Sequence, residues 1–248
     1  MKHEITRVRH ELRRRSLIVR RTEFVTPRML RLILAGQELA GFTSLSSDDH
    51  IKVFAPGEGG AVERRDYTPR RYDAGANELT LDFALHEAGP VTAWARGVKV
   101  GDTAEIGGPR GSAVVPHDFD WWLLIGDETA LPAIGRRVEE LLAGTPVTTI
   151  AGVTGPEEEQ LFTSQADHRA IWVHRPAAQA TDPAPLLRAL ETYAPPAGDG
   201  FIWIAAEAGV ARALRKHVVE VWRHPAPWLK ASGYWAIGKA DASEKLEP

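Results

Sequence analysis

The sequence contains no cysteine. This absence excludes disulfide bonds, iron–sulfur clusters held by thiolates and catalysis by a cysteine nucleophile. A chain without disulfides suits a reducing compartment, and we expect this protein to be cytoplasmic.

Long hydrophobic runs are absent as well. No apolar stretch approaches the ~20 residues that a membrane-spanning helix needs, and the charged amino terminus lacks the hydrophobic segment of a signal peptide. We therefore expect neither membrane insertion nor secretion.

Charge of one sign is not in large excess, because the net charge is only −3. Nine arginines nevertheless lie within the first 31 residues. No motif with interleaved aromatic residues accompanies them, so we interpret the cluster as a solvated strand face and expect no nucleic-acid partner.

The first half of the chain has the pattern of short strands. Polar and apolar residues alternate over residues 17–25, 29–34, 51–54 and 78–86, and turn-forming residues separate these segments. In the last segment Leu79, Leu81, Phe83 and Leu85 fall on one face. The spacing predicts a small antiparallel β-barrel.

The second half has a different pattern. Buried apolar strands are predicted at residues 121–125, 147–153, 170–174, 201–205 and 233–237, and helices lie between them. The helical stripes are Ile134, Val138 and Leu141, and then Leu214, Val218 and Val221. This alternation predicts a parallel-sheet domain, which follows a linker near residues 116–120.

The segment Arg65-Asp66-Tyr67-Thr68-Pro69-Arg70 places a cation, an aromatic ring and a hydroxyl on one short strand. If the segment is extended, Arg65 and Tyr67 point to the same face. A guanidinium can pair with a pyrophosphate, a phenol can cover an isoalloxazine ring and a hydroxyl can bond a ring nitrogen. The segment is a candidate flavin site, and the alternative is an exposed strand with surface arginines.

A second candidate is the turn at Gly89 and Pro90, which leads from a strand into a short helix. Free amides and the positive end of the helix dipole meet at such a start, and Thr92 adds a hydroxyl. The turn can therefore hold a phosphate, or it can be a plain strand-to-helix connection.

Several motifs follow one another in a characteristic order. They are Arg65-Asp66-Tyr67-Thr68, Asp82-Phe83-Ala84-Leu85-His86, Gly89-Pro90, Gly107-Gly108-Pro109-Arg110-Gly111-Ser112, Gly126-Asp127-Glu128-Thr129-Ala130-Leu131-Pro132-Ala133 and Gly233-Tyr234-Trp235. Over nearly the whole chain the set resembles the siderophore-interacting proteins, which are FAD-dependent ferric-siderophore reductases related to the ferredoxin-reductase superfamily. The resemblance implies a six-stranded antiparallel FAD-binding barrel over residues 1–117 and an NAD(P)-binding-like α/β domain over residues 118–248.

The resemblance also implies which residues hold the flavin. Tyr67 would lie on the ring and Thr68 near its reactive N5, and no side chain beyond the flavin would be catalytic. The other expected cofactor contacts are Arg65, Asp66, Asp82, Phe83, His86, Gly89, Pro90, Val91, Thr92, Asp127, Thr129, Ala130 and Trp235.

Family members use a basic triad to attract an anionic ferric siderophore, and the matching positions here are Lys52, Arg110 and Lys239. Point charges suit this role, because the protein does not need to coordinate the iron itself. We accordingly assign no resident metal ligands.

The electron donor is less clearly marked, because the second half lacks a G-x-G-x-x-G phosphate loop. The resemblance implies NAD(P)H, with Glu207, Ala208 and Arg212 as candidate contacts, and a ferredoxin is the alternative donor. Two other functions stay open, namely a general flavin reductase, which would not need the basic triad, and a non-catalytic siderophore-binding protein, which would not need flavin.

Overall fold

A computed structural model describes residues 3–85, 89–238 and 244–246 of the chain. Its contacts form two compact units, one of residues 4–115 and one that joins residues 1–3 to residues 116–248. No helix of the described residues is long and apolar enough to cross a membrane.

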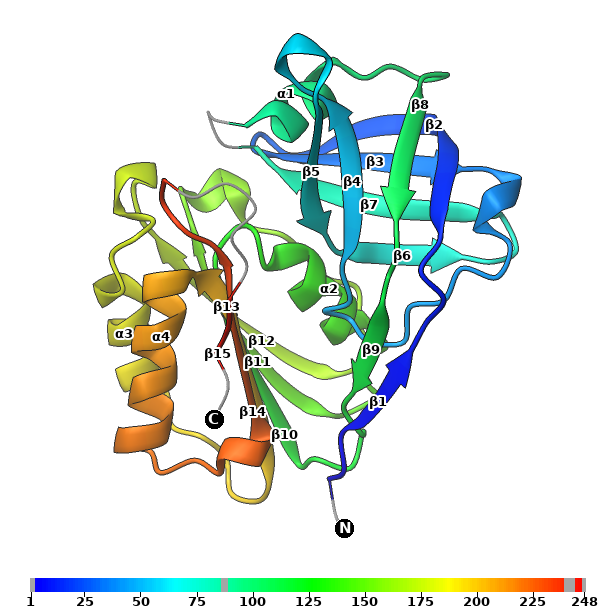
Figure 1. Cartoon of the computed structure of the whole chain (residues 1–248). Helices are drawn as coiled ribbons and strands as arrows, with labels where there is room; N and C mark the ends of the chain where they lie inside the picture. Colours follow the sequence, from blue (N-terminus) through cyan, green and yellow to red (C-terminus); the bar gives the residue numbers. More distant parts are fainter. Residues whose placement is uncertain (1–2, 86–88, 239–243, 247–248) are drawn as a thin grey trace. The chain divides into compact units, whose positions relative to one another are not determined.

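The first unit is a curled antiparallel sheet, drawn in blue to green in Figure 1. Its seven strands are, in spatial order, β5 (Val62–Tyr67), β4 (Ile51–Pro56), β8 (Thr103–Gly107), β2 (Arg14–Thr26), β3 (Met29–Ala35), β7 (Glu78–Ala84) and β6 (Pro69–Asp73). The outermost strands β5 and β6 are joined by Thr68 alone, so the sheet must bend round to bring its two ends together. The predicted antiparallel barrel is thus a half-barrel of seven strands rather than six.

Smaller elements complete this unit. Strands β1 (Thr6–Arg9) and β9 (Gly111–Val114) pair antiparallel, helix α1 spans Pro90–Gly97, and 3₁₀ turns span Gln37–Leu39 and Glu58–Gly60.

The core of the first unit follows the alternation in the sequence. The four residues predicted to share a face of β7 and the residue after it are buried, with Leu79, Leu81 and Phe83 fully so. They pack against the inner faces of β2 and β3, where Leu17 and Leu32 are also fully buried. Each such side chain stabilises the fold by about 1.5–3 kcal/mol.

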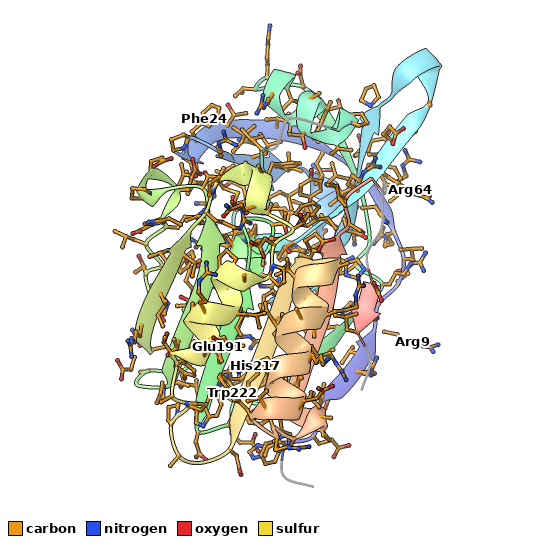
Figure 2. The ribbon with its side chains drawn as sticks, turned by 90° about the vertical axis from the view of Figure 1, so that its left-hand side faces the viewer. Arg9, Phe24, Arg64, Glu191, His217 and Trp222 are labelled. Carbon is orange, nitrogen blue, oxygen red and sulfur yellow. The ribbon has the colours of Figure 1, made fainter. Side chains whose placement is uncertain are left out.

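The arginine cluster near the amino terminus is only in part a solvated face. Most of its members are exposed, and Figure 2 shows Arg9 projecting from the ribbon. Arg15 differs, because it lies on the inner face of β2 and is only 4% exposed. Arg31 is half-buried and paired with Asp82. The alternation along a strand turns such residues inward wherever their position matches the apolar face.

The second unit contains a six-stranded mixed sheet with helices packed on it. The spatial order is β12 (Asp167–His174), β11 (Pro146–Val153), β10 (Trp121–Gly126), β13 (Gly200–Glu207), β14 (Leu229–Trp235) and β15 (Glu244–Leu246). The first five strands are parallel, as predicted, and β15 adds an antiparallel edge. The central strands β10 and β13 are buried along their whole length, which explains their continuous apolar sequences.

The helices of this unit are α2 (Leu131–Glu140), α3 (Ala184–Glu191) and α4 (Ala208–Lys216), with 3₁₀ turns at Pro156–Glu158, Ala177–Gln179 and Ala226–Trp228. A π-helical turn over His217–Val221 continues α4. Its wider turn explains why one predicted core residue, Val221, is 64% exposed, whereas Leu214 and Val218 are buried. The rings of His217 and Trp222, labelled in Figure 2, meet at 5.6 Å across this turn.

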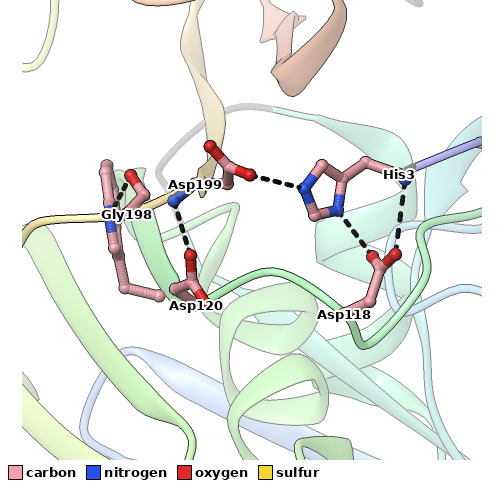
Figure 3. Close-up of polar contacts among 6 residues, drawn as sticks. His3, Asp118, Asp120, Gly198 and Asp199 are labelled. Atoms are coloured by element: carbon pink, nitrogen blue, oxygen red, sulfur yellow. Dashed lines mark hydrogen bonds and ion pairs between the residues drawn. The ribbon is translucent and has the colours of Figure 1, made fainter.

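His3 belongs to the second unit. Its ring nitrogens lie 2.7 Å from Asp118 Oδ1 and 3.1 Å from Asp199 Oδ2. Figure 3 draws both contacts as dashed lines. The ring also stacks on Phe119 at 4.1 Å. These contacts hold His3 beside the loop that leads into β10.

Candidate functional site

The tyrosine of the Arg65 to Arg70 segment stands at the end of strand β5. Its ring lies 4.2 Å from that of Phe83 at an angle of 41°. Burial raises the pKa of Tyr67 to about 12, while a hydrogen bond with the Thr92 side chain and the charge of Arg65 act in the opposite direction. The Thr92 contact brings the aromatic residue of one predicted motif to the helix start of the other.

Helix α1 begins without a side-chain cap. Gly89 precedes it with a φ of 142°, Pro90 occupies the first turn, and no side chain among the described residues accepts from the free amides. The buried Thr92 points its hydroxyl toward Tyr67. Unsatisfied amides and the helix dipole make this start suitable for an anion.

Strand β7 uses two of the predicted flavin contacts for its own packing. The Asp82 carboxylate accepts two hydrogen bonds from Arg31, at 2.7 and 2.8 Å, and Arg70 lies 3.8 Å away. Phe83 is fully buried in the core. Any contact of these two residues with a flavin would therefore come from their backbone. Sequence reasoning missed Arg31, although it stands directly opposite Asp82 in the β3–β7 register.

The cationic residues predicted to attract the siderophore differ in whether an ion pair neutralises their charge. Lys52 Nζ forms an ion pair with Asp66 Oδ2 at 3.0 Å across the β4–β5 ladder, so part of its charge is neutralised. Arg110 is exposed, and its guanidinium makes no hydrogen bond or ion pair within the described part of the chain. Lys239, like the predicted flavin contact His86, lies outside the described residues.

Two other predicted flavin contacts, Asp66 and Arg65, have polar atoms that can form further hydrogen bonds. Asp66 Oδ1 is buried and has no hydrogen-bond partner within the part of the chain that the structure describes. Arg65 is half-buried and donates to Glu63 Oε2 at 3.1 Å and to the Arg64 carbonyl. The Thr68 hydroxyl is buried at the corner between β5 and β6.

In the second unit, the structure brings together three predicted residues around one carboxylate. Asp127 Oδ1 accepts from the amide and the hydroxyl of Thr129, at 2.9 and 2.6 Å. Asp127 Oδ2 accepts from the amide of Glu207 and from Trp235 Nε1, both at 2.9 Å. The carboxylate therefore ties together the carboxyl ends of β10, β13 and β14. Ala130, which lies three residues after Asp127 at the start of α2, is fully buried.

The candidate nicotinamide contacts already have structural partners. The Glu207 side chain caps α4 by accepting from the amides of Gly209 and Val210, at 2.6 and 3.1 Å. Ala208 is buried, and Arg212 forms an exposed ion pair with Glu244. Only the backbone of this turn is left for a dinucleotide, together with Arg212 if its pair opens.

Sequence reasoning missed a buried ion pair at the same edge of the sheet. Arg175 follows β12, is almost fully buried and lies 2.8 Å from Glu128 Oε2. Burial and the charge of Asp127 raise the pKa of Glu128, and Arg175 opposes them. Since 47 residues separate the partners, no local motif could have predicted the pair.

A flavin dinucleotide fits the donor set of the first unit. The cofactor would need an anion site, which the uncapped start of α1 provides, and an aromatic surface, which Tyr67 provides. It would also need buried hydrogen-bonding groups, and these are the Thr68 hydroxyl and the Asp66 oxygen that has no partner among the described residues. Gly89 adds to the fit, because a positive φ near 142° is rarely open to residues with a Cβ. The described residues contain no group of three or more His, Asp or Glu side chains arranged to hold a metal ion.

Two family models match the chain, and several known proteins are similar to it. Residues 119–238 match the siderophore-interacting protein family, and residues 18–64 and 61–113 match the siderophore-interacting FAD-binding domain. The chain is 34% identical over 250 residues to an NADPH-dependent ferric-chelate reductase of Escherichia coli, covering 92% of this chain and 95% of that protein. It is 28% identical over 240 residues to the ferric vibriobactin reductase ViuB of Vibrio cholerae, covering 88% of each.

A solved structure is similar as well. The siderophore utilization protein from T. fusca superimposes with a TM-score of 0.90 at 35% identity, covering 96% of this chain and 98% of that one. Less similar structures include a flavohemoglobin with bound FAD, at 14% identity, and a ferredoxin reductase in its FAD apo form, at 16% identity, and they show the fold alone. On these grounds, the chain belongs to the siderophore-interacting protein family.

Proposed function

We propose that this protein is an FAD-dependent reductase of ferric siderophores that takes its electrons from NAD(P)H. The observation that carries the proposal is the contact between Tyr67 and Thr92, which places a ring suited to a flavin beside an uncapped helix start suited to its phosphates. Membership of the family and the names of its 34% and 28% identical relatives support the same activity.

The side chains of the first unit would bind and orient the cofactor. The amides at the start of α1 and the Arg65 guanidinium would take the pyrophosphate, Tyr67 would cover the ring, and the buried Thr68 hydroxyl would hydrogen-bond near N5. When bound, FAD supplies the chemistry of accepting a hydride and giving single electrons. In the second unit, Asp127, Thr129, Ala130 and Trp235 remain the predicted cofactor contacts.

The substrate would be attracted by charge and not by coordination. Ferric siderophores with catecholate or carboxylate groups are anionic, and a cation 4 Å from an anionic oxygen contributes ~4 kcal/mol at the effective dielectric of a protein surface, before desolvation. Arg110 is exposed and forms no ion pair with any described residue, whereas Lys52 shares its charge with Asp66. Ferrous iron binds hard oxygen ligands more weakly than ferric iron, so reduction would release the metal.

NAD(P)H would bind at the carboxyl edge of the parallel sheet. In open α/β sheets, ligands bind where the strand order reverses, and that point here lies between β10 and β13. A ferredoxin remains the alternative donor, since the polar side chains at this edge are engaged with one another.

An anaerobic absorbance experiment tests the function. The FAD-loaded protein is mixed with NADH or NADPH, and then with an anionic ferric tris-catecholate complex and a ferrous chelator. We expect bleaching of the flavin bands, reoxidation, and the colour of the ferrous chelate. Reoxidation after chemical reduction but not after NAD(P)H would replace NAD(P)H by a ferredoxin, and a protein that takes up no FAD would refute the proposal.

The role of the basic residues is tested by Arg110→Glu. We expect a higher KM for the ferric complex, with a larger effect at low salt because ~0.15 M salt screens charges beyond about 8 Å. The flavin content should not change. Arg20→Glu, which makes the same charge reversal at an exposed site on β2, is the control, and an equal rise in KM for both variants would remove Arg110 from the substrate site.

A further inference from the structure

We propose that Arg15 is a positioning residue for Arg110, acting through the backbone of the turn that carries it. The inference rests on the proposed function, because it concerns how a substrate-attracting cation is held in place.

The turn between β8 and β9 lies against the start of β2. The amide of Gly108 donates to the Arg13 carbonyl at 3.0 Å, and the amide of His10 donates to the Arg110 carbonyl at 2.9 Å. Gly108 and Pro109 are buried, and Gly108 has a φ of 103°, which favours glycine. The backbone of the turn is therefore fixed, although Arg110 itself is exposed.

Arg15 holds the inner side of this turn. It is only 4% exposed, and its NH1 group donates to the Gly108 carbonyl at 3.0 Å and to the Arg13 carbonyl at 3.4 Å. Its Nε donates to the Glu38 carbonyl at 2.9 Å. A planar guanidinium can reach three carbonyls at fixed angles, which a lysine ammonium on a flexible stem cannot reproduce.

The environment of Arg15 supports a role in positioning the turn that carries Arg110. Within the described residues it forms no ion pair, and its guanidinium lies 5.3 Å from the Phe42 ring centroid. A buried charge that is bonded only to carbonyls is costly to keep, since an apolar residue could fill the same core position. What the guanidinium adds is the fixed position of the Gly108 carbonyl, two residues before Arg110.

The far side of the turn has a second support. Ser112 Oγ donates to Asp49 Oδ2 at 2.6 Å and accepts from the Leu45 amide at 3.1 Å. His10 Nε2 lies 2.7 Å from Ser112 Oγ. Supports at both ends leave the Arg110 side chain as the part of the turn free to meet a ligand.

The experiment measures the KM for an anionic ferric tris-catecholate complex with the FAD-loaded full-length protein. We expect Arg15→Lys to raise this KM by about fivefold, because a shift of the order of 1 Å at a substrate contact weakens binding. Reduction of a neutral quinone, which needs no cationic contact, should keep its kcat and KM. Arg20→Lys is the matched control and should change neither reaction.

A double-mutant comparison separates placement from general stability. If Arg15 acts through Arg110, the effect of Arg15→Lys on the KM disappears in an Arg110→Ala background. An equal rise in both backgrounds, or no rise where Arg110→Ala alone has an effect, would overturn the inference. If Arg110→Ala alone leaves the KM unchanged, the substrate role of Arg110 fails together with the inference, whereas flavin bleaching by NAD(P)H tests the reductase separately.

Ser112→Ala provides a second variant if Arg15→Lys does not fold. It loosens the same turn from its other end without removing a buried charge, so we expect the same selective rise in KM and the same loss of effect in the Arg110→Ala background. A Ser112→Ala protein with an unchanged KM would show that the turn needs no support to place Arg110.

Discussion

At the scale of single residues, the carboxylate of Asp127 holds three segments of the second unit together. Its two oxygens accept four hydrogen bonds, from Thr129, Glu207 and Trp235, while the side chain is almost fully buried. A carboxylate suits this position, because it offers only acceptors to four donors.

Asp127→Asn should therefore destabilise the protein by about 2–4 kcal/mol, since the amide turns an NH₂ group toward donors. Urea unfolding followed by tryptophan fluorescence measures the change. Asp167→Asn removes an exposed carboxylate at the start of β12 and should have little effect. Equal stability of the two variants would contradict the role given to Asp127.

Tyr67 provides a prediction about pH. Burial raises its pKa to about 12, so the folded state holds the phenol proton more tightly than the unfolded state does. This contribution to stability is fully present below the ordinary tyrosine pKa of about 10 and is lost as the pH rises through 12. Tyr67→Phe should remove the latest phase of phenolate absorbance in an alkaline titration, and Tyr193→Phe should leave that phase in place.

At the scale of elements, helix α1 combines a sequence signal with a structural one. Pro90 and Gly89 mark its start in the sequence, and no side chain in the described ranges of the chain caps that start. The amides are then free for an anion, and binding of the pyrophosphate would supply the missing cap.

Gly89→Ala should weaken FAD binding by about tenfold, which corresponds to about 1.4 kcal/mol, because alanine rarely adopts a φ of 142°. Titration of the apoprotein with FAD, followed by quenching of flavin fluorescence, measures the affinity. Gly97→Ala, at the other end of the same helix, meets no atom within 4 Å and has no positive φ, so the affinity should stay unchanged. Equal weakening by both substitutions would point to the stability of α1 and not to its start.

At the scale of the whole molecule, the chain does not divide into two simple consecutive parts. His3 precedes the first unit in sequence and packs in the second, where it bridges Asp118 and Asp199 across separations of 115 and 196 residues. Asp120 accepts from the Asp199 amide beside it, so three carboxylates gather around this contact.

The contribution of this contact to the stability of the fold should decrease at acid pH. The hydrogen bond from His3 lowers the pKa of Asp118, while partial desolvation opposes it. A lowered pKa stabilises the folded state above the ordinary aspartate pKa of about 3.9, and this contribution is lost as the pH falls through the lower value. Asp118→Asn should reduce the Tm at pH 6, and its difference from the parent should shrink below about pH 4. A difference that is constant over this range would exclude Asp118 as the titrating group.

The sequence by itself determined most of the strands and helices, and it supplied the candidate flavin motifs. Alternating residues such as Leu79 and Leu81 predict strands because the side-chain period of a strand is two, and the continuous apolar run at β10 predicts a strand covered on both faces. The motif from Arg65 to Thr68 and the turn at Gly89 depend on neighbouring residues, so they can be identified without a fold.

Only the tertiary structure decided which charged side chains pair with one another. Asp82 meets Arg31, Glu128 meets Arg175 and Lys52 meets Asp66 across 51, 47 and 14 residues, and Arg15 turns inward to bond three carbonyls. The seventh strand of the sheet and the exposure of Val221 were likewise decided by sheet closure and by a π-helical turn. The physical reason is that pairing and burial depend on distances between segments remote in sequence, whereas strand and helix formation depend largely on residues close together.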